Sequence, residues 1–330
     1  MLDKYRREIN YLRVSITDRC NLHCTYCRPK EGISIKGHDD ILRYEEIIRI
    51  ISVAVEMGLV KVRVTGGEPL VRRNFIGFIA SLKNIAGLRD ISLTTNGILL
   101  EKFTRDIFNA GIHRINISLD SLKEEKYKTI TGGGDLRAVL RGIEKSRKIG
   151  FAPIKINTVV MKGLNDDEVL DFAQMAFENP FQIRFIELMP FGQAQELHAR
   201  NYISIDCIRD TISKRYKIDE IEGKKNSSDG PAKIFRLREG LGEIGFISPL
   251  SSHFCATCNR LRLTADGKLR SCLLSDDEID LKGQLRRNCT DAELKKYIYE
   301  AITLKPGHHH ITCAETHLKK CQRGMSTIGG

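Results

Sequence analysis

The chain of 330 residues contains no tryptophan, no run of eighteen apolar residues, no low-complexity tract and no secretory apolar region after its first residues. These absences argue against a membrane-spanning or secreted protein. Disulfides are therefore not expected, and the ten cysteines are free to stay reduced or to bind metal. The sequence predicts a cytoplasmic protein without a membrane partner.

Charge of one sign is not concentrated anywhere, although 53 basic residues against 42 acidic ones give a net charge of +11. No block of five or six like charges occurs, and no zinc-finger, RRM or KH pattern is present. The charge is compatible with nucleic acid, with a polyanionic small substrate or with solubility alone. We interpret it as weak evidence for a phosphate-bearing substrate and expect no nucleic-acid partner.

Three cysteines near the start, Cys20, Cys24 and Cys27, have the spacing C-x3-C-x2-C. A tight loop with this spacing brings three soft thiolates onto three irons of a 4Fe–4S cluster and leaves the fourth iron open. A zinc site usually needs four ligands in C-x2-C pairs, which this triplet fits poorly. The spacing therefore favours a cluster with one open iron.

This triplet follows a predicted strand at 12–17 and has an aromatic residue, Tyr26, before its last cysteine. Downstream, Gly66 and Gly67 precede Glu68-Pro69 at the end of an apolar run, where glycines allow a close backbone approach. Together these features resemble the radical SAM enzymes. The resemblance implies that S-adenosylmethionine (SAM) binds the open iron and, on reduction, yields a 5′-deoxyadenosyl radical.

Strands and helices alternate up to about residue 190. We predict strands at 12–17, 60–65, 90–95, 113–119, 153–161 and 182–188, with helices at 44–57, 75–82, 99–110, 136–149 and 167–177. This order indicates an α/β fold with a parallel sheet. Six βα units are too few for a closed eight-unit barrel, so we expect a partial open (β/α)6 TIM-type barrel. Functional residues of such folds lie at the carboxyl ends of the strands.

The pattern changes after residue 190, so we expect a barrel at 1–190 and a small α+β extension at 191–330. Strands are predicted at 232–237, 243–247, 261–263 and 268–271, with a loop at 222–230 and a helix at 291–302. The extension carries a second triplet, Cys255, Cys258 and Cys272. The hairpin turn at 265–267 would fold the third cysteine back onto the first two.

Two interpretations of the second triplet stay open. A zinc ribbon would need a fourth ligand such as His253 or Cys289. A second 4Fe–4S cluster, again with one open iron, is favoured by the presence of the first site.

With both triplets, the chain resembles the GTP-cyclising family of radical SAM enzymes that begins molybdenum-cofactor biosynthesis. The matching segments are 61–70, 93–97, 116–120, 183–189, 258–262 and 325–330. The resemblance implies two 4Fe–4S clusters and SAM, hydrogen abstraction from C3′ of GTP, and attack of the carbon radical on C8 of guanine. It also implies an external low-potential electron donor and a downstream cyclic pyranopterin monophosphate synthase. The oligomeric state, a homodimer included, stays open.

The resemblance further assigns residues. Cys20, Cys24 and Cys27 would bind the first cluster and Cys255, Cys258 and Cys272 the second, whose open iron would hold the guanine base. SAM contacts are expected at Tyr26, Gly67, Ser118 and Met189. GTP contacts are expected at Arg13, Arg63, Thr94, Lys155, Arg184, Arg260 and Arg262. The terminal Gly329 and Gly330 would reach the active site.

Two other functions compete with this one. A peptide-modifying radical SAM maturase would carry a longer and more cysteine-rich extension. A basic zinc protein that binds nucleic acid would explain the second triplet but not the first. We assign no ligand role to Cys207, Cys289, Cys313 or Cys321, and we expect His308, His309 and His310 to lie in a loop.

Overall fold

The computed structural model describes residues 1–27, 36–190, 194–221, 230–309 and 323–329. Cys313, Cys321, His310, Gly330 and nearly all of the predicted loop 222–230 lie outside these residues. Within them, the chain forms one sheet of twelve strands in the order β12-β11-β10-β1-β2-β3-β4-β5-β6-β9-β8-β7.

Six parallel strands form the middle of the sheet, as predicted: β1 (Tyr11–Ser15), β2 (Lys61–Thr65), β3 (Asp90–Thr95), β4 (Ile115–Ser118), β5 (Ile154–Val160) and β6 (Phe181–Glu187). Burial along β5 alternates, with Ile154, Ile156 and Val160 fully buried against the helices. The intervening positions, among them Lys155 and Asn157, face the other side of the sheet. The polar side chains of the strands therefore gather inside the arc.

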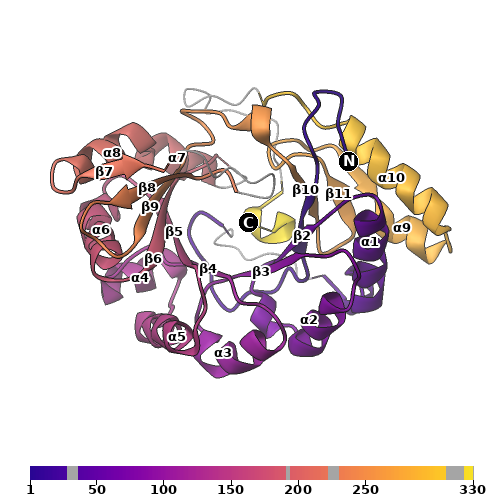
Figure 1. Ribbon diagram of the computed structural model, residues 1–330, viewed down its shortest axis with the longest axis horizontal. Helices are drawn as coiled ribbons and strands as arrows, with labels where there is room; N and C mark the ends of the chain where they lie inside the picture. Colours follow the sequence, from indigo (N-terminus) through magenta and orange to yellow (C-terminus); the bar gives the residue numbers. More distant parts are fainter. Residues whose placement is uncertain (28–35, 191–193, 222–229, 310–322, 330) are drawn as a thin grey trace.

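Helices cover the outer, convex face of this sheet (Figure 1). They are α1 (Tyr44–Glu56), α2 (Phe75–Lys83), α3 (Leu100–Asn109), α4 (Glu124–Thr131), α5 (Leu136–Ile149), α6 (Val169–Glu178) and α8 (Ile205–Ser213). The short α7 (Ala194–Asn201) packs instead beyond the carboxyl ends of the strands, where Leu197 contacts a cluster that contains Met161 and Leu188. Local signals set their ends: Asp135 accepts the backbone N–H of Ala138 at the start of α5, and Gly150 caps its end. The sequence reasoning did not predict α4, α7 or α8; α8 contains Cys207.

The C-terminal strands extend both edges of this sheet. β9 (Glu243–Ile247) pairs parallel with β6, and β10 (Arg260–Leu263) pairs parallel with β1. β8 (Lys233–Leu237) and β7 (Ile218–Glu220) follow β9, whereas β11 (Lys268–Arg270) and β12 (Glu278–Asp280) follow β10, all antiparallel. The four strands predicted at 232–237, 243–247, 261–263 and 268–271 are confirmed, and they form two antiparallel pairs.

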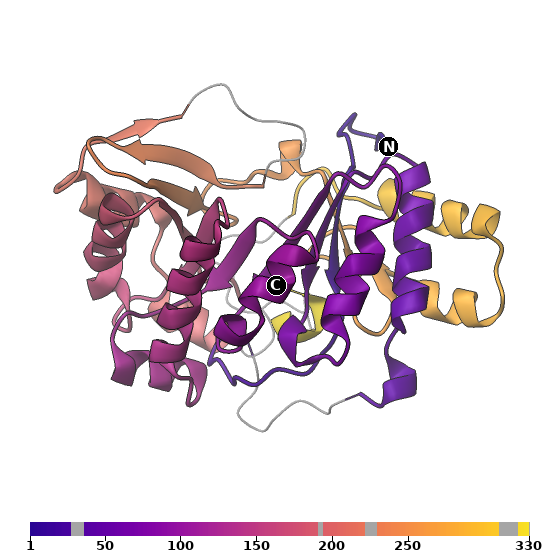
Figure 2. The same ribbon diagram turned by 60° about the horizontal axis from the view of Figure 1, so that its bottom comes forward.

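The sheet stays open, because β12 and β7 are its two ends in the described part of the chain. The predicted open, partial α/β barrel is therefore confirmed. The helices α9 (Leu281–Arg286) and α10 (Asp291–Thr303) pack outside the C-terminal strands, and Cys289 lies buried between them in the main hydrophobic core. Short helix α11 (Met325–Ile328) lies inside the arc in both views (Figure 2). No described helix has the length and apolar character needed to cross a membrane.

Candidate active site

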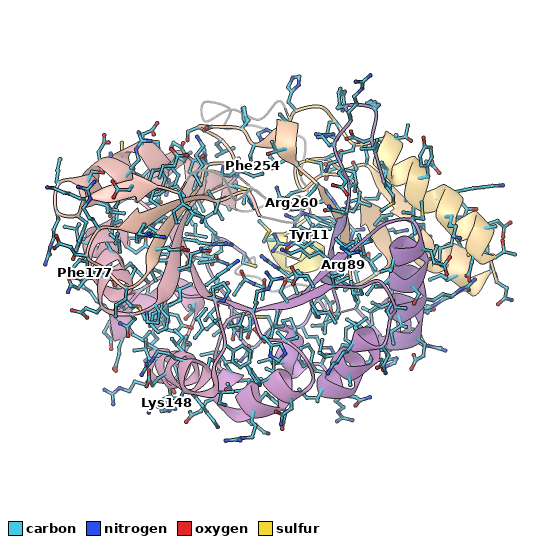
Figure 3. The ribbon with its side chains drawn as sticks, in the orientation of Figure 1. Tyr11, Arg89, Lys148, Phe177, Phe254 and Arg260 are labelled. Carbon is cyan, nitrogen blue, oxygen red and sulfur yellow. The ribbon has the colours of Figure 1, made fainter. Side chains whose placement is uncertain are left out.

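A cavity lies on the inner side of the sheet and brings both cysteine triplets to its wall. Figure 3 shows Tyr11, Phe254 and Arg260 inside the arc, whereas Lys148 lies at its outer surface. Of the residues predicted from sequence, the cavity is lined by Arg13, Cys20, Cys24, Tyr26, Cys27, Arg63, Gly67, Thr94, Ser118, Arg184, Met189, Cys255, Cys258, Arg260, Arg262 and Cys272. Segments more than two hundred residues apart in the chain thus share one chamber.

The first cysteine loop is held against the end of α4. His23 and Thr25 donate backbone hydrogen bonds to the carbonyls of Thr131 and Ile130, at 2.9 Å each. A tight turn follows, in which the N–H of Cys27 donates to the carbonyl of Cys24 at 2.9 Å. The loop therefore presents its half-buried thiols from a fixed backbone.

The backbone of Gly66 and Gly67 lies close against the backbone that leads into the first cysteine loop. A Cβ on Gly66 would lie 2.6 Å from the carbonyl oxygen of Thr17, and one on Gly67 would lie 2.2 Å from that of Arg19. Gly66 also has a φ of +148°, which favours glycine. The N–H groups of Gly67 and Glu68 donate to the same two carbonyls, each at 2.8 Å. These glycines therefore fix the cysteine loop to the end of β2.

Burial dominates the electrostatics of the first triplet. It raises the pKa of Cys24 well above its usual range, and the neighbouring Cys27, Asp120 and Cys20 add to the effect. Burial also raises the pKa of Asp120 to about 6. The Tyr26 hydroxyl donates to Asp120 Oδ2 at 2.7 Å, which fixes the ring beside the thiols. Positive iron would compensate the thiolate charge that this site otherwise disfavours.

The second triplet lies on the β10–β11 hairpin. Cys255 begins a short helical turn just before β10, Cys258 follows that turn, and Cys272 lies beyond the end of β11. Because Arg262 pairs with Arg270 across the hairpin, the third cysteine returns to the first two, as predicted. Burial opposes ionisation of Cys258, but Arg260 and Lys305 outweigh it and lower its pKa to about 6.

Among the described residues, no three His, Cys, Asp or Glu side chains converge where one metal ion could sit. Thiolates of a four-iron cluster ligate different irons and need no such convergence. Soft thiol donors in two half-buried triplets are the ligand set that iron–sulfur clusters use. The donor chemistry of both sites therefore fits such a cluster.

Three arginines stand side by side between the two triplets, and we call them the arginine row. Arg262 on β10 is paired in register with Arg13 on β1, which is paired with Arg63 on β2. Neighbouring strands lie about 4.8 Å apart, so like charges directly opposite repel. Arg262 is only 4% exposed and Arg63 only 8%. A row of like charges with two buried members and a half-buried one between them favours the binding of an anion.

The pKa values reflect the same crowding. Burial lowers the pKa of Arg262 well below its usual range, and Arg13 and Arg260 add to the effect. Burial, Arg184 and Arg63 lower the pKa of Lys155 to about 6. Of the predicted GTP contacts in the described chain, Lys155 alone is absent from the cavity wall. It lies two residues before Asn157 on β5 and faces the same side of the sheet.

The C-terminal tail reaches the arginine row. Arg262 Nη1 donates to the carbonyl oxygen of Gly329 at 2.6 Å. Arg323, at the start of the tail, donates from Nη1 to both carboxylate oxygens of Asp266, at 3.0 and 3.1 Å. Its Nη2 donates to Glu278 Oε2 at 2.8 Å. The tail is therefore anchored on the hairpin and ends beside an arginine of the row.

Several cavity residues were missed by the sequence reasoning. Tyr11 lies just before the predicted strand, and Asp120 lies within the matching segment 116–120 but received no role of its own. Lys305 and His309 follow a helix, in a loop without a local signal. His308 and His309 do lie in a loop, as expected. The remaining cavity residues without a predicted role are Leu22, Thr65, Thr95, Asn96, Asn157, Val159, Ile186, Gly230, Pro231, Ile247, Pro249, Phe254, Ser271, Leu273, Leu274 and Met325.

Three buried oxygens in the cavity wall fit an absent ligand. Thr94 Oγ1, Asn157 Oδ1 and Ser271 Oγ have no hydrogen-bond partner among the described residues. Buried polar atoms are normally hydrogen-bonded, and each unsatisfied one costs roughly 1–3 kcal/mol. A polar ligand in the cavity would satisfy them.

Comparison with known proteins agrees with this architecture. The family model of the radical SAM superfamily matches residues 14–176, and that of molybdenum cofactor synthesis C matches residues 181–311. Proteins named GTP 3′,8-cyclase are 48% identical over all of both chains in Moorella thermoacetica (330 residues) and Thermodesulfovibrio yellowstonii (335 residues).

A solved structure supports the fold. The crystal structure of Streptococcus suis SuiB bound to S-adenosylmethionine superimposes with a TM-score of 0.55 at 13% identity. The superposition covers 83% of this chain and 63% of that protein. At this identity the likeness concerns the fold alone.

Proposed function

Because the chain belongs to the GTP 3′,8-cyclases of the radical SAM superfamily, we propose that it converts GTP into 3′,8-cyclo-7,8-dihydro-GTP, the first step of molybdenum-cofactor biosynthesis. The observation that carries the proposal is the arginine row Arg262–Arg13–Arg63, which stands between two cysteine triplets in one cavity. It provides a polyanion site beside two sets of cluster ligands.

The first triplet, Cys20, Cys24 and Cys27, would hold a 4Fe–4S cluster with SAM on its open iron. Together the two groups supply the one-electron chemistry that starts the family's radical reaction. Tyr26 is fixed by its hydrogen bond to Asp120. With Gly67, Ser118 and Met189 it forms the wall that would orient SAM.

The second triplet, Cys255, Cys258 and Cys272, would hold a second 4Fe–4S cluster whose open iron takes the guanine base. Support comes from its place in the same cavity as the first triplet. The ribose of GTP would then lie between the two metal sites, which is where hydrogen abstraction from C3′ requires it.

The triphosphate would bind the arginine row. Arginine forks match phosphate oxygens, and neutralisation by the phosphates would relieve the repulsion within the row. Arg260 lies two residues before Arg262 on β10, and Arg184 lies on β6, farther along the same cavity wall. Lys155 adds an amine close enough to Arg184 for their charges to repel. Thr94 Oγ1 offers a buried hydroxyl that has no other partner in the described chain.

We further propose that Gly329, together with Gly330 beyond the described residues, completes the triphosphate end of the site. The carbonyl of Gly329 already binds Arg262. We also propose that the chain divides near residue 190 into two segments. The two family models, which match residues 14–176 and 181–311, support a division into two parts.

The proposed reaction also needs partners and a reducing environment. An external low-potential donor supplies the electron, and a cyclic pyranopterin monophosphate synthase takes the product. A cytoplasmic location follows from cysteines that must stay reduced. A homodimer stays open.

Deuterium transfer tests the proposal. GTP deuterated at C3′ is incubated anaerobically with the reconstituted protein, SAM and dithionite. We expect deuterium in the 5′-deoxyadenosine that forms. Unlabelled 5′-deoxyadenosine, formed while GTP is consumed, would contradict abstraction at C3′.

A further inference from the structure

Lys305 is a buried cation to which the proposed reaction assigns no role. It follows α10 in a loop, is only 2% exposed and lies in the wall of the cavity. Burying an ammonium group is costly unless it is paired or hydrogen-bonded. Among the described residues it forms no ion pair with a carboxylate, so other groups must compensate its charge.

Two of those groups are backbone carbonyls of the hairpin that carries the second triplet. Lys305 Nζ donates to the carbonyl oxygens of Arg260 and Ser271, at 2.7 Å each. Arg260 is two residues after Cys258, and Ser271 immediately precedes Cys272. One ammonium group therefore ties together the two strand ends from which these cysteines project.

These bonds lie beyond the regular pairing of the hairpin. The recorded β10–β11 register ends at Arg262 with Arg270, on the side of the cysteines. Past that pair no ladder hydrogen bond fixes the strands' separation in the described chain. At this open end of the hairpin, the two hydrogen bonds of Lys305 hold the strands at a fixed separation instead.

The remaining compensation comes from the thiols. Burial lowers the pKa of Lys305, while Cys258 and Cys272 act in the opposite direction and favour its charged form. The amine therefore lies near enough to both thiols for their charges to interact. Groups next to metal ligands tune both metal affinity and reduction potential.

We propose that Lys305 is the positioning residue of the second cluster: it fixes the spacing of Cys258 and Cys272, and its charge stabilises the reduced cluster. The inference rests on the proposed second cluster. A reduced cluster carries one more negative charge than an oxidised one, so a nearby cation favours reduction and raises the potential.

The test measures the second cluster alone, in a Cys24→Ala background that removes the first. Lys305→Met loses both the charge and the bonds, whereas Lys305→Gln loses the charge but keeps a donor. Lys295→Met is the matched control, because this lysine lies on the preceding helix α10 and pairs with Glu56 at the surface.

The midpoint potential is to be measured by an EPR-monitored redox titration. Cluster stability is to be measured as the rate at which a chelator removes iron. Lys305→Met should release iron about tenfold faster, the loss typical of removed outer-shell partners. Both Lys305 variants should titrate at a more negative potential, with Lys305→Gln retaining iron better. Lys295→Met should match the parent protein in both measurements.

Three outcomes separate the claims. If both Lys305 variants keep the potential and iron retention of the parent, the inference is wrong while the second cluster stands. If Lys305→Met does not fold, Lys305→Gln decides, and an unchanged potential in it overturns the inference. If the parent Cys24→Ala protein shows zinc and no four-iron signal, the second cluster fails and this inference fails with it.

Discussion

Replacing Arg13 by methionine is expected to stabilise the GTP-free protein and to weaken GTP binding at the same time. Arg13 is the middle member of the arginine row, with Arg262 on one side and Arg63 on the other. Methionine keeps much of the apolar stem and removes the charge. The two effects have opposite signs because the row is arranged for an anion that the free protein lacks.

The magnitude follows from the charge state. Burial, together with Arg63 and Arg260, lowers the pKa of Arg13 to about 10, and such a depression corresponds to roughly 3 kcal/mol against the charged form. Arg13 is charged in the folded and the unfolded chain below that pH, so the full cost applies at neutral pH. Allowing for solvent screening and lost packing, we expect a gain of about 1–2 kcal/mol in the free energy of unfolding.

Thermal unfolding with and without GTP measures both effects. The free variant should melt about 1–4 °C above the parent protein. The stabilisation by GTP should shrink, because a lost phosphate contact of about 1.5–3 kcal/mol weakens binding at least tenfold. Arg236→Met is the control, since Arg236 lies exposed on β8 and should change neither quantity. A variant of Arg13 that melts lower than the parent and binds GTP normally would refute the reasoning.

Three other predictions concern separate parts of the site. Cys24→Ala should abolish 5′-deoxyadenosine formation, whereas Cys272→Ser should retain SAM cleavage and lose GTP cyclisation; product analysis by mass spectrometry of both variants checks this, and undiminished 5′-deoxyadenosine from Cys24→Ala would contradict it. Burial lowers the pKa of Lys155 to about 6, so GTP binding near pH 7.5 should take up close to one proton and should strengthen as the pH falls toward 6. Calorimetry in two buffers of different ionisation enthalpy measures that uptake, which should vanish in Lys155→Met; a binding enthalpy independent of buffer in the parent protein would count against it. Arg323→Gln should release the tail from Asp266, because it removes the charged contact between them. We expect faster carboxypeptidase trimming of the C-terminus and lower GTP turnover, with normal SAM cleavage in the absence of GTP. Equal trimming of variant and parent would show that this ion pair does not hold the tail.

Local patterns predicted the elements of this fold well, because their signals lie within each segment. The predicted strand 90–95 is β3 (Asp90–Thr95), and the predicted helix 136–149 is α5 (Leu136–Ile149). Burial along α5 follows the helical period, and α5 has a clear cap at each end. Helix α4 (Glu124–Thr131) was missed because it is only eight residues long and most of those residues are polar.

Long-range pairing could not be predicted in the same way. The four residues of β10 do not indicate that β1 will be their partner, although this pairing brings Arg262 opposite Arg13. The arginine row is therefore a property of the assembled sheet. The role of Lys305 is even harder to predict, because a lysine before a proline is typical of a surface loop. Only its contacts with the hairpin show that it is buried there.

The cysteine triplets are the opposite case. Their spacing alone leads to the proposal that each triplet binds metal, and the turn at 265–267 predicted that Cys272 returns toward Cys258. That the two triplets share one cavity is a tertiary fact, which the sequence supported only through a resemblance.

The most direct test of the central claim is an anaerobic reaction of the reconstituted protein with SAM, dithionite and GTP, read by mass spectrometry. We predict 5′-deoxyadenosine together with an isomer of GTP, in comparable amounts. If neither forms although the protein carries a full load of iron and sulfide, the claim that the first triplet holds a cluster with an open iron is contradicted.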